Sequence, residues 1–264
     1  MNLPVEVIEA VNKGKCLLFV GPTFSLEAAA EHGRDYPDGK SIAKSLGWTR
    51  PKRMVGARKT IIVPSPAKGA ALVEKKLGRS ALVSQAKGLL DVSDVPGIPA
   101  HRIALSRFPM IFTTNYDRLL ERTAEDMGGA ATVAYRGEEI PEADPAKRVI
   151  YKLWGGFEKP ESLVMTEADH NLVALDTPLR RKIRTLIRRN VVFFVGYRPD
   201  EEHFERLWGD LTECYGGELP RCHMAVAQGK INDYLWQKWV WRGLLMFTAD
   251  PTECMEELEK RIET

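Results

Sequence analysis

The chain has 264 residues, enough for one large α/β domain or for a domain with a substantial insertion. Hydrophobic residues make up 44% of it, which excludes global disorder, and the net charge of +2, from 38 basic and 36 acidic residues, gives no reason to expect a nucleic-acid partner. No apolar run approaches the roughly 18 residues of a membrane-spanning helix, so we expect a globular protein without a membrane partner.

The cysteines and the amino-terminal residues indicate a reducing compartment. Cys16, Cys214, Cys222 and Cys254 form no C-x-x-C pair, so we expect reduced thiols and no structural zinc. Residues 1–6 lack the basic segment followed by an apolar one that marks a signal peptide. We therefore expect a cytoplasmic protein without bound metal.

The first elements have the pattern of a nucleotide-binding fold. Residues 5–11 predict a short helix, and residues 16–20 predict a compact apolar strand. A glycine-containing turn over residues 21–25 then leads to a helix over residues 26–31. A strand, a glycine-containing turn and a helix open a Rossmann-type fold, in which the helix amino terminus is offered to a phosphate.

The next part of the chain is different, because strand signals nearly vanish from Gly33 to about Ser106. Helical patterns cover residues 41–46, 70–77 and 80–90, separated by joints that contain proline and glycine. We interpret residues 33–106 as a mainly helical insertion between the first and second strands of the sheet, within a single domain that spans residues 1–264.

Strands and helices alternate in the rest of the chain. Strands are predicted at residues 110–113, 132–135, 149–153, 191–195, 223–227 and 244–247, with a further extended piece at 163–166. Helices are predicted at residues 118–127, 178–190, 201–208, 232–242 and 251–263. This alternation predicts a Rossmann-like, doubly wound α/β fold with a mostly parallel sheet covered on both faces. The arginines along the helix at 178–190 allow a nucleic-acid interpretation, but a solvated helix face is the simpler one.

Four of the predicted strands end at residues suited to a ligand site. α/β folds hold their ligands at the edge of the sheet formed by the carboxyl ends of the strands. Four residues fall at such strand ends: Gly21, Asn115, Trp154 and Gly196. The alternative for Asn115 and for Asp117 is that they only cap the helix that follows. The agreement of four strand ends favours a shared crevice.

These positions resemble the motifs of SIR2-like proteins, relatives of the sirtuins that bind NAD. Gly21-Pro22-Thr23-Phe24-Ser25 is similar to the Gly-Ala-Gly-x-Ser turn of that family, and Thr113-Thr114-Asn115-Tyr116-Asp117 to its Thr-x-Asn-x-Asp signature. Lys152-Leu153-Trp154-Gly155 stands at the Leu-His-Gly place, Gly196-Tyr197 with Asp200 at the late Gly-Tyr-Ser-x-x-Asp element, and Thr166 with Asp169 between them. The resemblance is to the prokaryotic branch that includes NAD-depleting effectors of antiphage defence, and the cysteine pairs of the deacetylases are missing.

The resemblance implies a site for NAD or ADP-ribose with defined roles. Asn115 would orient the ribose or the attacking water, Asp117 would support that loop, and Ser25 with the first turn would hold the pyrophosphate. In the family a histidine then acts as general base toward a ribose hydroxyl. The nucleotide-binding positions implied are Gly21, Thr23, Phe24, Ser25, Thr114, Asn115, Gly196 and Tyr197.

Two departures from the family pattern weaken the case for efficient hydrolysis. Trp154 stands at the histidine position, and an indole has one N–H donor and no basic nitrogen. In the first turn, Pro22 removes a backbone donor and the β-branched Thr23 replaces a glycine. The histidines all lie outside the motif, and we expect each to be a surface or packing residue: His32, His101, His170, His203 and His223.

Three functions remain open from the sequence. The first is a nucleotide-binding, catalytically impaired relative with a regulatory or scaffolding role, acting as a homo-oligomer or with a partner subunit. The second is an active NAD glycohydrolase in which Asn115 directs a water molecule without a histidine. The third is an interaction module whose crevice is filled by side chains and binds no nucleotide.

Overall fold

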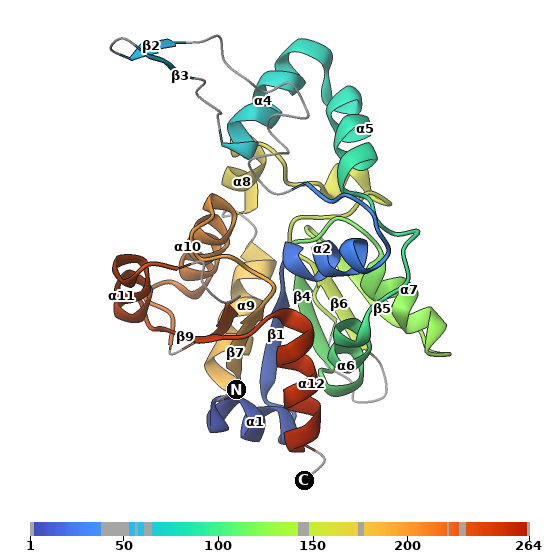
Figure 1. Ribbon diagram of the computed structural model, residues 1–264, viewed down its shortest axis with the longest axis vertical. Helices are drawn as coiled ribbons and strands as arrows, with labels where there is room; N and C mark the ends of the chain where they lie inside the picture. Colours follow the sequence, from blue (N-terminus) through green and yellow to red (C-terminus); the bar gives the residue numbers. More distant parts are fainter. Residues whose placement is uncertain are drawn as a thin grey trace.

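The computed structural model describes residues 3–37, 53–55, 58–60, 65–141, 148–173, 177–220, 222–226 and 231–262. Its centre is a seven-stranded sheet in the order β5-β6-β4-β1-β7-β8-β9, in which every neighbouring pair is parallel (Figure 1). The strands are β1 Cys16–Val20, β4 Met110–Thr113, β5 Ala131–Tyr135, β6 Arg148–Lys152, β7 Val191–Val195, β8 Cys222–Val226 and β9 Leu244–Thr248. The predicted Rossmann-like α/β fold is confirmed.

Helices cover both faces of this sheet. The helices of the described residues are α1 Val5–Asn12, α2 Pro22–Glu31, α4 Pro66–Leu77, α5 Arg79–Leu90, α6 Pro99–Arg107, α7 Leu119–Asp126, α8 Glu167–Val173, α9 Thr177–Arg189, α10 Glu202–Tyr215, α11 Asp233–Trp241 and α12 Pro251–Ile262, with a 3₁₀ turn, η1, at Pro160–Ser162. One face packs against α1, α2, α6, α7 and α12, and the other against α9, α10 and α11.

The strands have apolar residues throughout because both faces of the sheet are buried. In β1, Leu17 and Phe19 contribute to the core under α9 and α10, whereas Leu18 and Val20 contribute to the core under α2 and α12. Successive side chains of a strand point to opposite faces, so a strand covered on both sides reads as a continuous apolar run. This is why short apolar runs located most strands correctly.

The strand order reverses direction around β1, which positions the site. β1 pairs with β4 on one side and with β7 on the other, and the register places Val20 beside Thr113 and beside Val195. Ligand crevices of open α/β sheets form where the order reverses, at the carboxyl ends of the strands. The residues that follow β1, β4 and β7 therefore meet at one level.

The interval that we expected to be a helical insertion contains helices and a hairpin. α4 and α5 lie together beyond the carboxyl edge of the sheet (Figure 1). They share a small core with residues that follow β6, including Phe157, Leu163 and Met165. An antiparallel hairpin is formed by β2 Arg53–Val55 and β3 Arg58–Thr60, which the sequence did not predict. The predicted helix at 41–46 lies outside the described residues, and the boundaries of the insertion stay a prediction.

Other elements also differ from the sequence predictions. α2 begins at Pro22 and not at residue 26, because proline suits the first helical position, where its missing N–H costs nothing. α6 was not predicted, although it packs against α7 and α12 and belongs to the layer over the sheet. Residues 163–166 follow η1 and join no strand of the described sheet.

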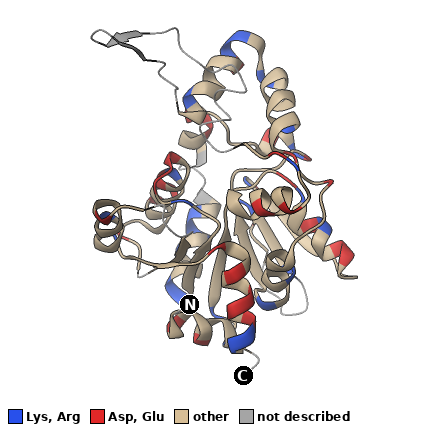
Figure 2. Cartoon of the chain, viewed as in Figure 1, with Lys and Arg blue, Asp and Glu red and all other residues tan. Residues whose placement is uncertain are grey.

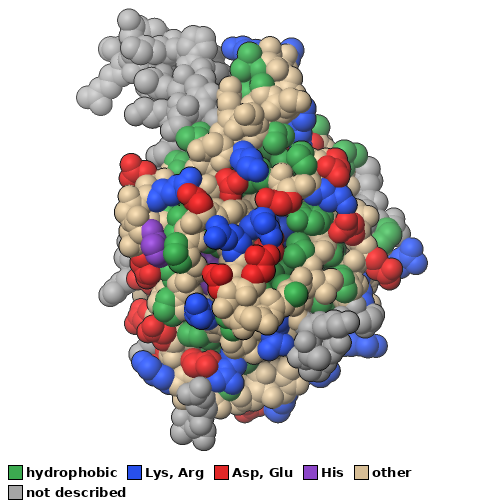
Figure 3. Space-filling view, turned by 90° about the vertical axis from the view of Figure 1, so that its right-hand side faces the viewer, with side chains coloured by type: hydrophobic (Ala, Val, Ile, Leu, Met, Phe, Trp, Pro, Cys, Tyr) green, Lys and Arg blue, Asp and Glu red, His purple; other side chains and the backbone are tan. Residues whose placement is uncertain are grey.

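Charged residues lie mostly on the helices and loops around the sheet (Figure 2). In the space-filling view, acidic and basic side chains alternate across the face that is shown (Figure 3). The arginines of α9 serve the end of α10: Arg180 and Arg184 donate to the carbonyl oxygens of Glu213 (3.2 Å) and Tyr215 (2.6 Å). This arrangement favours a structural role for that basic face. In the described part of the chain, no helix is both long and apolar enough to cross a membrane.

Candidate functional site

Asn115 lies directly after β4 and is held by the turn that follows β1. Its Nδ2 donates to the carbonyl oxygen of Gly21 (3.1 Å) and to Ser25 Oγ (2.9 Å). A carbonyl oxygen can only accept, so this contact fixes which end of the amide faces Gly21. Asn115 Oδ1 is buried and has no hydrogen-bond partner among the described residues. Because buried polar atoms are normally paired, this oxygen is an acceptor available to a ligand or a water molecule.

Ser25 links Asn115 to Asp117. It accepts from Asn115 and donates to Asp117 Oδ2 at 2.6 Å, while Asp117 Oδ1 accepts the backbone N–H of Leu119 at the start of α7 (3.0 Å). Asp117 thus bonds both to Ser25 of the β1 turn and to the first backbone N–H of α7, whereas the amide of Asn115 is directed to the β1 turn. Burial raises the pKa of Asp117, against the opposing effects of Lys152, Ser25 and the Leu119 amide.

A buried lysine, Lys152, bonds to the loop that contains Tyr116 and Asp117. The sequence did not predict this role. Lys152, the last residue of β6, is fully buried. Its Nζ donates to Glu121 Oε1 (2.8 Å), to the carbonyl oxygen of Tyr116 (3.4 Å) and to that of Asp117. Burial opposes its charge, but the carboxylates of Glu121 and Asp117 outweigh burial and raise the pKa of Lys152 above its ordinary value. Little in the sequence indicated this role, because a lysine at a strand end is usually exposed.

Trp154 is buried after β6 and lies between two histidine rings. Its ring centroid is 4.2 Å from that of His203 and 4.7 Å from that of His170. His203 Nε2 is 2.8 Å from Thr114 Oγ1, the hydroxyl of the residue before Asn115. His203 thus packs against Trp154 and bonds to Thr114, because the first turn of α10 brings it to the carboxyl end of β4. His170 fits a packing role.

Gly21 and Gly196 cross each other where β1 and β7 end. Gly196 has a φ of +80°, and a Cβ on Gly21 would lie 2.4 Å from the Gly196 carbonyl oxygen. The buried Tyr197 ring covers Gly21, and its hydroxyl donates to the carbonyl oxygen of Val20 (2.9 Å). Both glycines are thus required by close backbone approach.

The backbone donors at the start of α2 are used within the protein. Pro22 has none, the N–H of Thr23 donates to the Gly196 carbonyl oxygen (2.9 Å), and that of Phe24 donates to the Gly21 carbonyl oxygen (3.2 Å). A pyrophosphate at this turn would have to replace those bonds or use side chains such as Ser25. The predicted pyrophosphate contact stays a prediction.

The remaining motif residues Asp169 and Asp200 bond to groups other than Asn115. Asp169 Oδ2 accepts the N–H groups of Met165 and Thr166, both at 2.9 Å, and Arg79 Nη1 at 2.8 Å. Although burial opposes it, these donors lower the pKa of Asp169. Asp200 pairs with Arg198 at the surface.

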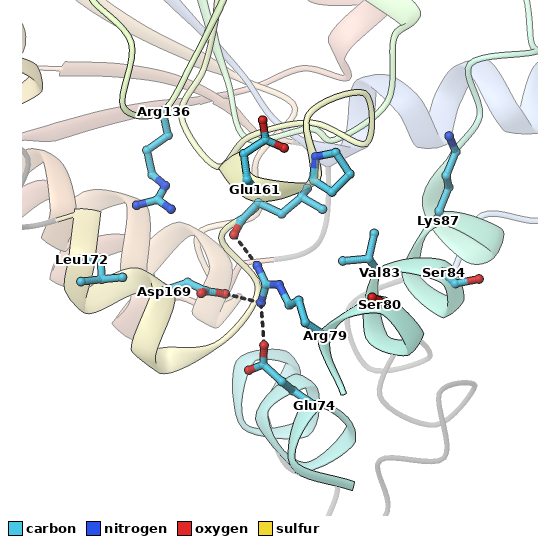
Figure 4. Close-up of a pocket in the computed structure, with 12 residues that line it drawn as sticks. Glu74, Arg79, Ser80, Val83, Ser84, Lys87, Arg136, Glu161, Asp169 and Leu172 are labelled. Atoms are coloured by element: carbon cyan, nitrogen blue, oxygen red, sulfur yellow. Dashed lines mark hydrogen bonds and ion pairs between the residues drawn. The ribbon is translucent and has the colours of Figure 1, made fainter. Parts of the chain in front are cut away.

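A separate pocket of about 710 Å³ lies between α5, η1 and α8 (Figure 4). Arg79 reaches across it to Asp169, Glu74 and the Leu163 carbonyl oxygen. None of the strand-end residues Gly21, Asn115, Trp154 or Gly196 lines it. Over the ranges described, there is also no group of three or more His, Cys, Asp or Glu residues that could hold a metal ion.

Comparisons with known proteins found a family model and two relatives. A family model described as SIR2-like domain matches residues 109–242. That span contains β4, Asn115, Trp154, Gly196 and His203, and it leaves out the β1 turn.

Two relatives match at low identity. Defense-associated sirtuin 2 of Bacillus subtilis is 26% identical over 206 residues, which cover 73% of this chain and 19% of that protein. NAD(+) hydrolase ThsA of Bacillus cereus (strain MSX-D12) is 24% identical over 131 residues, which cover 48% of this chain and 27% of that protein. The matched regions are therefore less than a third of each relative.

Proposed function

This chain belongs to the SIR2-like family, and we propose that the carboxyl edge of its sheet binds NAD or ADP-ribose and that Trp154 impairs hydrolysis there. The observation that carries the proposal is the buried, unpartnered Oδ1 of Asn115. A ribose hydroxyl or a water molecule supplies the donor that this atom lacks. A relative named for NAD(+) hydrolysis supports the choice of nucleotide.

The ribose end of such a ligand fits the described side chains better than the phosphate end. Asn115 Oδ1 offers an acceptor, and Ser25 and Asp117 hold the amide in place. The first amides of α2 are already bonded, and the Tyr197 ring covers Gly21. A pyrophosphate therefore binds either through side chains such as Ser25 or after Tyr197 or the first turn has moved.

Impaired hydrolysis follows from the chemistry of the bond that breaks. Separation of nicotinamide from ribose develops positive charge on the sugar, and a base must take a proton from the attacking water or from a ribose hydroxyl. The indole of Trp154 cannot accept that proton. We therefore propose slow turnover at a site that retains Asn115.

A slow enzyme that keeps its ligand site is suited to a regulatory or scaffolding role. We propose that this role belongs to bacterial antiphage defence in the cytoplasm, with a second copy or a partner subunit. Support comes from the relative named Defense-associated sirtuin 2. The match covers 19% of that protein.

A second candidate is an interaction module that binds no nucleotide. The observation in its favour is that Tyr197, Trp154 and Phe24 are all buried at the carboxyl edge. In this interpretation the crevice is permanently filled by these side chains. It predicts that no nucleotide changes the stability of the protein.

Thermal unfolding with NAD and with ADP-ribose separates the two candidates. We expect a Tm that rises with ligand concentration in the wild type, because a ligand of the folded state adds about 2.7 kcal/mol at 100 times its Kd. Asn115→Ala should abolish the ligand-dependent rise. Asn232→Ala is the matched control: it removes the cap of α11 and lowers the Tm itself, but it should keep the rise. No rise with either nucleotide would favour the filled crevice.

A further inference from the structure

A chain of hydrogen bonds connects His203 to the interior of the sheet. His203 Nε2 is 2.8 Å from Thr114 Oγ1, Thr114 Oγ1 donates to the Tyr197 hydroxyl (3.3 Å), and that hydroxyl donates to the carbonyl oxygen of Val20 (2.9 Å). The chain thus joins the first turn of α10 to the ends of β4, β7 and β1.

The directions of these hydrogen bonds assign the proton of His203 to Nε2. The Val20 carbonyl oxygen can only accept, so the Tyr197 hydroxyl proton points to it and the Tyr197 oxygen accepts from Thr114. With its own proton used in that way, Thr114 Oγ1 accepts from His203, which places the proton on Nε2. Nδ1 then carries the lone pair, and it has no hydrogen-bond partner among the described residues.

His203 lies beside Trp154, near the end of β4 that precedes Asn115, and its ring is neutral. Its half-buried ring lies against Trp154, and its hydrogen-bond partner Thr114 immediately precedes Asn115. Burial lowers the pKa of His203 to about 3, so the ring is neutral at pH 7 and can accept a proton. A base this weak takes a proton slowly, in agreement with impaired hydrolysis.

We propose that His203, through Nδ1, is the general base of NAD hydrolysis in this protein, a role that rests on the proposed function. The bond between ribose C1′ and the nicotinamide nitrogen breaks, and its electron pair passes to the nicotinamide ring. The oxygen of a water molecule bonds to C1′, and the proton of that water passes to Nδ1 and then to solvent. The products are nicotinamide, ADP-ribose and one proton.

The test measures nicotinamide release and ADP-ribose binding for His203→Gln and for the control His170→Gln. Both histidines contact Trp154, but only His203 bonds to Thr114. We expect His203→Gln to lose about 100-fold in release, in the range that a general base contributes, while ADP-ribose still binds. His170→Gln should stay within about threefold of the wild type.

A second pair of variants tests the hydrogen-bond chain. Thr114→Val removes the hydroxyl that bonds to His203 and should reduce release about tenfold, while ADP-ribose binding stays measurable. Thr114→Ser keeps that hydroxyl and should lose less than Thr114→Val does. Retention of release in His203→Gln overturns the proposal. So does a wild type that binds NAD without turnover, which leaves the proposed function standing. A wild type that neither binds nor cleaves NAD overturns the proposed function as well.

Discussion

Single side chains at the carboxyl edge are oriented by partners from other elements. Asn115 comes from the end of β4, but the Gly21 carbonyl oxygen and the Ser25 hydroxyl of the β1 turn decide how its amide lies. Ser25 then gives its own proton to Asp117. With the amide oriented in this way, Asn115 Oδ1 has no partner in the described structure. Because the partners come from different elements, the candidate site depends on the fold and not on one loop.

Lys152 gives a prediction at this scale. Lys152→Met removes the cation but keeps most of the side-chain volume, and it leaves Glu121 and Asp117 buried without their counter-charge. Loss of one partner of a buried ion pair costs about 3–5 kcal/mol. We expect that decrease in the free energy of unfolding, measured with urea.

The matched control is Lys159→Met, which removes a lysine paired with Glu138 near the surface. Exposed ion pairs contribute about 1 kcal/mol or less. A decrease for Lys152→Met no larger than for Lys159→Met would show that the buried lysine does not hold the loop.

At the scale of elements, the crossing of the β1 and β7 ends gives a second prediction. Gly196→Ala places a methyl group 2.8 Å from the Phe24 ring, at a φ of +80°. Both effects are unfavourable, and we expect a loss of about 1–3 kcal/mol in urea unfolding. Gly209→Ala, inside α10 with open space around its Cβ, should instead gain up to about 1 kcal/mol. Equal effects of the two variants would contradict the proposed close approach.

The elements also show how much the sequence could predict. Apolar runs located β1, β4, β6 and β7, and the polar or glycine residues after them identified the edge that holds Asn115. His203 could not be found in that way, because it lies in the first turn of α10, after the Gly196 motif, and only the packing of α10 brings it to Thr114. Lys152 looked like an ordinary strand end, since the partners of a buried charge come from distant parts of the chain.

For the whole molecule, a histidine buried in the layer over the sheet makes the free energy of unfolding sensitive to acid. His101 of α6 is buried beside Phe24, and burial lowers its pKa to about 4. The unfolded chain protonates this histidine near its ordinary pKa of about 6.5. Its contribution to stability is therefore present above about pH 6.5 and is lost as the pH falls toward 4.

His101→Leu should remove that part of the acid sensitivity. A difference of about 2.5 pKa units corresponds to at most about 3 kcal/mol, so the fall in unfolding free energy between pH 7 and pH 4.5 should be smaller in the variant by about 2–3 kcal/mol. His32→Leu, at an exposed position, is the control. The same pH dependence in His101→Leu and in the wild type would contradict the burial of a neutral imidazole.

We propose that the carboxyl edge binds NAD and that Trp154 limits its cleavage. The most direct test is nicotinamide release at saturating NAD by Trp154→His, beside Trp154→Phe, which also removes the indole but supplies no base. Folding of both variants is checked by thermal unfolding, since each leaves a cavity in the core. We expect at least a tenfold faster release for Trp154→His and no gain for Trp154→Phe. Equal release by folded Trp154→His and by the wild type would contradict it.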